Sequence, residues 1–160
     1  MEEVFQVERL PMAADLHTLR TTKFKTNLLA AVLQSDLSVD GATRNALLGQ
    51  VLRRGTRRWP NTADFMRNLD DLYGTSVTAD VAKKGERHML MFAVGVVNDA
   101  YLGGGDEMLR KGFGILRELM VEPAAEGSGL RADYVAQEKI NLRRRIESIL
   151  DDKQAYAFRR

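Results

Sequence analysis

The sequence predicts an α+β domain in which an antiparallel or mixed sheet packs against helices. Short stretches of alternating apolar residues stand in pairs, and longer stretches repeat apolar residues every three or four positions. Strands that return as hairpins favour this class over a doubly wound sheet, whose parallel strands need long crossovers. The 160 residues suit one domain, and a hydrophobic share of 44% supplies its core.

Alternating patterns and apolar runs predict the strands. We expect strands at residues 4–10, 15–20, 27–34, 76–82 and 88–97. The run from Asn27 to Gln34 is almost continuously apolar, which predicts a strand buried on both faces. Lys84-Gly85-Glu86 lies between the last two strands and predicts a hairpin turn.

Apolar residues at three- and four-residue spacing predict the helices. We expect helices at about residues 42–54, from 61 or 62 to 73, from 106 to 120, and from 131 onwards. The first three begin at a residue whose side chain can accept a hydrogen bond from a free backbone N–H. These caps are Asp40 or Thr43, Asn61 or Thr62, and Asp106.

Two connectors and the end of the chain complete the prediction. Glycines 103–105 and residues 123–129 are expected to form loops. The last helix contains no Gly or Pro that would stop it, and residues 154–160 are still helix-forming. We therefore expect a single domain, residues 1–160, that is truncated at its C-terminus.

One predicted helix carries the most informative pattern. Residues 46–56 read Ala-Leu-Leu-Gly-Gln-Val-Leu-Arg-Arg-Gly-Thr, with apolar residues at helical spacing and a glycine at the end. This frame resembles the zinc-binding helix of the insulinase/pitrilysin-type metallopeptidases, which carries His-x-x-Glu-His just before a Lys/Arg-Gly-Thr turn. In that motif two imidazoles share one helix face and hold one zinc ion, while the glutamate activates water.

The residues that do this chemistry are replaced. Aligning the frame on Arg54-Gly55-Thr56 places Ala46, Gly49 and Gln50 at the positions of His, Glu and His. A methyl group, a hydrogen atom and a neutral amide neither bind zinc nor activate water. The resemblance therefore implies a helix without metal-binding or catalytic residues, and we expect no cofactor.

The resemblance covers nearly the whole chain. It includes the opening strands, Leu69-Asp70-Asp71-Leu72-Tyr73-Gly74 and the hairpin from 81 to 97, and it ends at residues 138–153. In active members the last helix supplies a glutamate as the third zinc ligand. Setting Glu138 on the first acid of that helix puts Arg145 at the ligand position, where a cation would repel zinc.

The resemblance also implies a fold and a role. The chain is most similar to bacterial members that lack the zinc motif, and the alpha subunit of mitochondrial processing peptidase is a more distant analogue. Such proteins have two similar insulinase-like halves and form a clamshell with a zinc-bearing homologous subunit. We expect the chain to bind peptide or protein substrate and to support that partner. An active metallopeptidase with atypical ligands and a stand-alone protein-binding module remain open as alternatives.

The remaining polar candidates have ordinary interpretations. His17 and His88 lie on separate predicted strands without further ligands beside them, so we expect structural roles for both. Glu138 could face the vacated zinc site, although a salt-bridged helix residue is the commoner role for such a glutamate. We also hypothesise that Gln50 hydrogen-bonds Arg145 across that site.

The charged residues do not favour a nucleic-acid partner. Arginines occur at 53, 54, 57 and 58 and at 143–145, without interleaved aromatic residues, so we expect a solvated face or a partner contact. The 24 basic and 22 acidic side chains give a net charge of only +2.

Composition also narrows the expected location. The chain has no cysteine, which excludes disulfides and thiolate metal sites and fits a reducing cytoplasm. No apolar run approaches the ~18–20 residues of a membrane span, and the acidic start does not resemble a secretory signal. A helix cut short would leave an apolar stripe uncovered, so we also expect that the chain can form a homo-oligomer.

Overall fold

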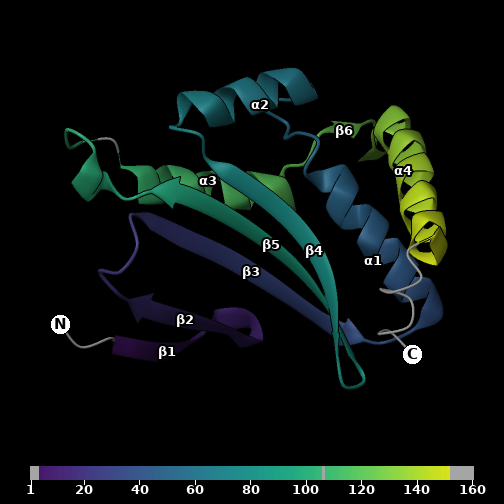
Figure 1. Ribbon diagram of the computed structural model, residues 1–160, viewed down its shortest axis with the longest axis horizontal. Coiled ribbons are helices and arrows are strands. Elements are labelled where there is room, and N and C mark those ends of the chain that lie inside the picture. Colours follow the sequence, from purple (N-terminus) through teal and green to yellow (C-terminus); the bar gives the residue numbers. More distant parts are fainter. Residues whose placement is uncertain (1–3, 106, 152–160) are drawn as a thin grey trace.

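The computed structural model describes residues 4–105 and 107–151, and the fold is α+β as predicted (Figure 1). The strands are β1 (Val4–Leu10), β2 (Ala14–Arg20), β3 (Thr26–Asp36), β4 (Ser76–Lys84), β5 (Arg87–Val97), β6 (Ala125–Glu126) and β7 (Gly129–Leu130). The helices are α1 (Val39–Leu52), α2 (Thr62–Asp71), α3 (Met108–Val121) and α4 (Ala132–Asp151). Short 3-10 turns lie at Pro11–Ala13 and Asp99–Tyr101.

The strands form antiparallel sheets. The central sheet of the described chain has the order β3-β5-β4, while β1 with β2 and β6 with β7 form separate two-stranded sheets. The predicted hairpin turn is confirmed, because Lys84 pairs with Arg87 across it. Gly85 in this turn has a φ of +58°, a conformation that glycine adopts without a steric penalty.

Helices cover one face of the central sheet (Figure 1). α3 contacts β3 and β5, α1 contacts β4 and β5, and α4 packs on α1. Alternate residues of β5 supply the core, since Leu90, Phe92, Val94 and Val96 are all buried. Burying one such side chain contributes roughly 1.5–3 kcal/mol, which makes β5 the centre of the fold.

β3 corrects one prediction. The apolar run predicts burial on both faces, yet Leu29 is its one buried residue, and Leu28 and Val32 are 75% and 47% exposed. The prediction is wrong because the helices cover a single face of the sheet and β3 lies at its edge. The uncovered face therefore carries exposed apolar side chains.

A side chain caps the start of each of the first two helices. Ser38 caps α1, in place of the predicted Asp40 or Thr43, and its hydroxyl accepts a hydrogen bond from the N–H of Gly41 at 3.1 Å. Asn61 caps α2 as predicted, and its side-chain oxygen accepts from a backbone N–H two residues on at 2.8 Å.

The connectors near α3 differ in part from the prediction. The N–H of Met108 at the start of α3 donates to the carboxylate of Asp99 at 2.9 Å, and the predicted cap Asp106 lies outside the described residues. Glycines 103–105 form a connector as predicted. The predicted loop at 123–129 is wrong in part, because β6 and β7 form a short hairpin there.

Candidate functional site

Helix α1 is held in place by apolar residues on two sides. Leu48 and Leu52 pack in the main core beneath the helices, whereas Leu47 and Val51 pack in a smaller cluster with Tyr134 of α4. The helical spacing that predicts these positions is therefore confirmed. α1 is consequently fixed between the sheet and α4, and its remaining positions define the space between them.

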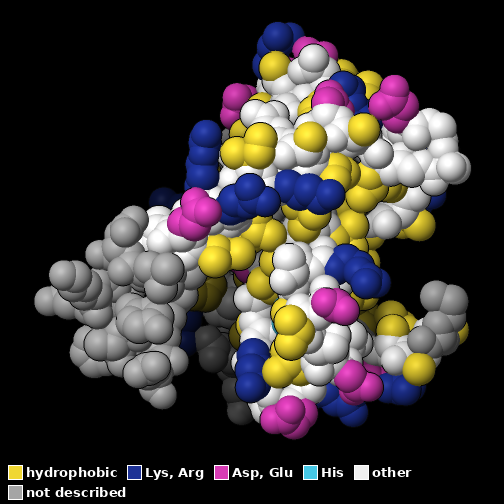
Figure 2. Space-filling model, turned by 90° about the vertical axis from the view of Figure 1, so that its right-hand side faces the viewer, with side chains coloured by type: hydrophobic (Ala, Val, Ile, Leu, Met, Phe, Trp, Pro, Cys, Tyr) yellow, Lys and Arg dark blue, Asp and Glu magenta, His cyan; other side chains and the backbone are white. Residues whose placement is uncertain are grey.

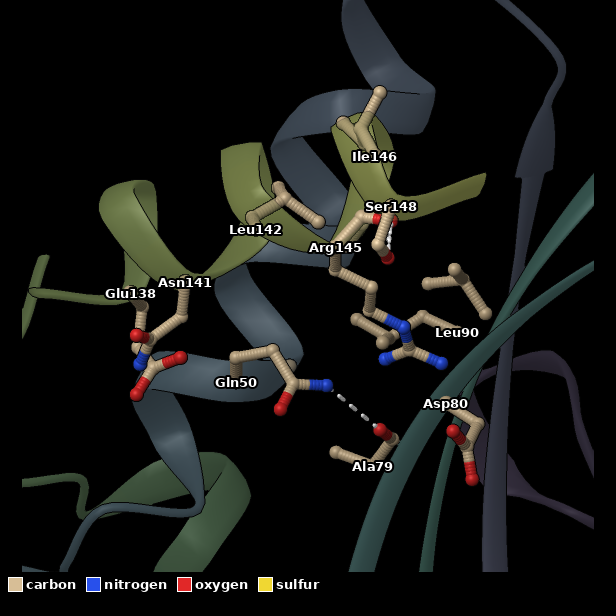
Figure 3. Close-up of a pocket in the computed structure, with 13 residues that line it drawn as sticks. Gln50, Ala79, Asp80, Leu90, Glu138, Asn141, Leu142, Arg145, Ile146 and Ser148 are labelled. Carbon is tan, nitrogen blue, oxygen red and sulfur yellow. Dashed lines mark hydrogen bonds between the residues drawn. The ribbon is translucent and has the colours of Figure 1, made fainter. Parts of the chain in front are cut away.

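The degenerate zinc-motif positions line a cavity bounded by α1, α4 and the strands β4 and β5 (Figure 3). α1 contributes Ala46, Gly49 and Gln50. The walls also include Ala79, Asp80, Val81, Leu90, Glu138, Leu142, Arg145 and Ile146. The volume is about 510 Å³, within the roughly 300–1,000 Å³ of small-ligand sites. The fold thus brings together all four positions that the resemblance aligns with zinc ligands and the catalytic glutamate.

The side chains at these four positions do not fit a zinc ion. Ala46 and Gly49 have no side-chain atom that could bind a metal, the Gln50 amide is neutral, and the Arg145 guanidinium is a cation. Within residues 4–105 and 107–151, no group of three or more His, Cys, Asp or Glu side chains is placed to hold a metal ion. These four positions therefore supply none of the side chains that usually bind zinc.

Gln50 bonds to the sheet and not to Arg145. Its Nε2 donates to the backbone carbonyl of Ala79 at 3.2 Å, and this contact is partly buried (Figure 3). Contrary to the hypothesis from the sequence, no hydrogen bond joins Gln50 and Arg145, although both line one cavity. The Arg145 side chain extends from α4 toward β4, and Asp80 lies near its end (Figure 3).

Gly49 lies tightly against the sheet. A Cβ atom at this position would be 3.1 Å from Cδ1 of Leu90 and 3.3 Å from Cβ of Ala79. Optimal separations between carbon atoms are about 3.5–4.0 Å. A larger side chain at Gly49, the position that the resemblance aligns with a glutamate, must therefore displace Leu90 or move α1.

The turn after α1 is fixed by three separate contacts. Nε of Arg54 donates to Oε1 of Glu138 at 2.6 Å. A Cβ on Gly55 would lie 2.5 Å from the carbonyl oxygen of Trp59, so this close approach requires glycine. Thr56 is fully buried, and its hydroxyl donates to a carboxylate oxygen of α3 at 3.0 Å.

Glu138 takes the salt-bridged role. Its side chain is 10% exposed and that of Arg54 is 21% exposed, so this ion pair between α1 and α4 is largely buried. Glu138 lies at the opposite end of the cavity from Arg145 (Figure 3). The expectation that Arg54 belongs to a solvated face or a partner contact is therefore wrong for this residue.

The two histidines lie in different sheets and outside the cavity. His88 on β5 is 4% exposed, and its Nδ1 lies 3.0 Å from Nδ2 of Asn45. His17 is exposed on β2 and stacks near Phe5, with ring centroids 5.8 Å apart. Both positions fit the structural roles expected from the sequence.

The surface beside the cavity has a mixed composition. Figure 2 shows positive, negative and hydrophobic side chains interspersed over the face that carries α1 and α4. Several members of the basic sets are exposed, including Arg53, Arg143 and Arg144. This surface does not form one continuous positive field of the kind that follows a phosphate backbone.

Comparison with known proteins identifies the family. No protein-family profile matches the chain. The chain is 45% identical over 141 residues to "Probable inactive metalloprotease YmfF" from Bacillus subtilis (strain 168), a match that covers 88% of the chain and 33% of that protein. The chain belongs to the YmfF-like family of metalloprotease homologues.

A solved structure agrees with this assignment. The crystal structure of a conserved protein from Enterococcus faecalis V583 matches the YmfF-like chain with a TM-score of 0.83 and 31% sequence identity, over 89% of the chain and 33% of that protein. The YmfF-like chain thus spans about one third of the length of both relatives. None of the helices in the described part of the chain combines the length and apolar character that crossing a bilayer requires.

The YmfF-like chain also contains polar contacts that its sequence does not reveal. Asn45 meets His88, and Thr56 meets Glu118, across separations of 43 and 62 residues. In the sequence, these polar residues stand beside apolar core positions. This indicates that they are buried, but it does not identify their hydrogen-bond partners.

Proposed function

We propose that the chain is part of a non-catalytic metalloprotease homologue that holds peptide segments and supports a zinc-bearing homologous subunit. The observation that carries this proposal is the cavity of about 510 Å³ at the degenerate zinc-motif positions. Its walls mix apolar side chains with polar ones, including Asn141 and Ser148, and polar groups in such a cavity can orient a ligand. The groups present can bind a ligand, but they cannot hydrolyse a peptide bond.

The edge of the sheet beside the cavity supports an extended peptide as the ligand. β4 is the outer strand of the central sheet on this side, and its residues Ala79, Asp80 and Val81 line the cavity. A peptide can add to such an edge through main-chain hydrogen bonds, with alternate side chains entering pockets. Gln50 already occupies the carbonyl of Ala79, so a peptide must displace this amide or pair beyond it.

The proposed partner follows from the missing chemistry. A homologue without zinc ligands would take part in zinc-dependent proteolysis only beside a subunit that has them, and the name of YmfF describes that relative as a probable inactive metalloprotease. The absence of cysteine fits a cytoplasmic location for the assembly. Assembly with a zinc-bearing subunit and a cytoplasmic location are both parts of this proposal, because the chain spans only one third of the relative's length.

Metal analysis, a cleavage assay and peptide binding together test the proposal. We expect no stoichiometric zinc and no cleavage by the chain alone, and saturable binding of an extended apolar peptide by fluorescence anisotropy. Ala46→Trp should fill part of the cavity and weaken binding, whereas Leu109→Trp adds the same ring outside the cavity lining and should not. Stoichiometric zinc with cleavage would overturn the proposal, and binding without co-purification of a peptidase subunit would favour a stand-alone module.

A further inference from the structure

The Arg145 guanidinium is the cationic group of the cavity that lacks an acceptor. Its side chain extends into the space between α4 and β4 (Figure 3), and no oxygen in the described part of the chain forms a hydrogen bond or ion pair with it. Arg143 and Arg144 precede it on α4, but neither lines the cavity. A guanidinium presents N–H donors in a fixed plane that matches the two oxygens of a carboxylate.

The oxygen-bearing neighbours leave this cation available. Gln50 directs its amide N–H to the sheet, and Glu138 is paired with Arg54 at the far end of the cavity. Asp80 lines the same cavity but forms no ion pair with Arg145. Arg145 is exposed, so the carboxylate of a molecule that enters the cavity can replace the water around its guanidinium.

We propose that the cavity selects an acidic residue of a bound peptide by pairing its carboxylate with Arg145. This inference rests on the proposed function, in which the cavity holds an extended peptide beside β4. Val81, Leu142 and Ile146 form apolar walls around the cation, so the preferred ligand is an aliphatic segment that carries a single Asp or Glu. The carboxylate of Asp80 opposes a second negative charge in the same segment.

Three labelled peptides test this selectivity on the full chain. The probes are fluorescein-labelled Val-Leu-X-Leu-Val peptides with Glu, Gln or Lys at X, titrated by anisotropy at low salt. We expect the Glu peptide to bind about fivefold more tightly than the Gln peptide, an effect sized for a partly exposed charge-assisted pair. High salt should reduce this ratio, because an exposed ion pair is screened.

Variants assign the preference to one side chain. Arg145→Gln should remove the Glu over Gln preference, while the matched Arg144→Gln should keep it. Arg145→Glu should invert the preference toward the Lys peptide, and Asp80→Asn should strengthen binding of the Glu peptide. Each position is exposed, and circular dichroism confirms that the variants fold.

The outcomes separate this inference from the proposed function. Equal binding of all three peptides by the unmodified chain would refute the acidic preference while leaving peptide binding intact. A Glu preference that persists in Arg145→Gln would also refute it. Failure of every peptide to bind would overturn the proposed function, and the inference with it.

Discussion

Replacing Gly49 by alanine tests whether packing, as well as chemistry, excludes the catalytic glutamate. Alanine in a helix interior is more favourable than glycine by roughly 0.5–1 kcal/mol. Nothing lies within 4 Å of a Cβ added at Gly114 in α3, so the full gain is expected there. At Gly49 the added atom meets Leu90 at 3.1 Å, and overpacking typically costs about 1–3 kcal/mol.

The glycines at 49, 112 and 114 should therefore form a series. Gly114→Ala should raise the free energy of unfolding by about 0.5–1 kcal/mol, whereas Gly49→Ala should lower it by up to about 2 kcal/mol. Gly112→Ala should be the most destabilising, because its Cβ would lie 2.6 Å from Leu29 and 2.9 Å from Val96. Gly49→Glu should cost more than Gly49→Ala, since it adds a buried carboxylate.

Urea unfolding followed by circular dichroism measures the series. Leu90→Val in the Gly49→Ala background removes the contacting Cδ1 atom, so a double-mutant cycle should show a favourable coupling between the two changes. The reasoning is refuted if Gly49→Ala stabilises the chain as much as Gly114→Ala does. A coupling of zero would likewise show that Leu90 does not limit the space at Gly49.

Three further predictions follow from the polar contacts. Ala46→His with Gln50→His should give no tight zinc binding by isothermal titration calorimetry, because the third ligand and the groups that orient imidazoles are absent; tight binding would contradict this. Glu138→Ala should lower the free energy of unfolding by about 2–4 kcal/mol because its arginine partner stays largely buried. Asp15→Ala breaks an exposed pair and should change it by less than about 1 kcal/mol, so equal losses would refute the contrast. A hydrogen bond from a neighbouring arginine lowers the pKa of Asp133 below its ordinary value of 3.8. The stability advantage over Asp133→Asn should therefore be present above about pH 4 and decline as the pH falls through the lowered pKa, whereas a constant difference would contradict it.

The types and order of the main elements could be predicted because neighbouring residues determine them. The cap at Asn61 and the turn at Gly85 depend on a few adjacent groups, and both predictions are confirmed. The exposure of β3 could not be predicted in this way. Burial of a strand depends on what covers its second face, and the apolar run from Asn27 contains no information about that cover.

In the candidate site, too, local features could be predicted and contacts between distant residues could not. The alignment on the turn after α1 identified the positions that line the cavity, because a rigid helix carries the spacing of its residues into space. The contacts within the site were not predictable, since Arg54 meets Glu138 at a separation of 84 residues. Gln50 likewise donates to a backbone carbonyl on β4, and no pattern of side chains in the sequence identifies that carbonyl as its partner.

The turn after α1 is held by contacts that do not depend on metal chemistry. Arg54 ties α1 to α4, Gly55 permits the close approach of the Trp59 carbonyl, and Thr56 ties the turn to α3. None of these contacts uses a metal ion or the side chain of Ala46, Gly49, Gln50 or Arg145. The turn is therefore fixed independently of those four positions, although Gly49 packs against Leu90 and Gln50 bonds to β4. An Arg-Gly-Thr turn is accordingly evidence for the helix packing, whereas evidence for catalysis must come from the residues that line the cavity.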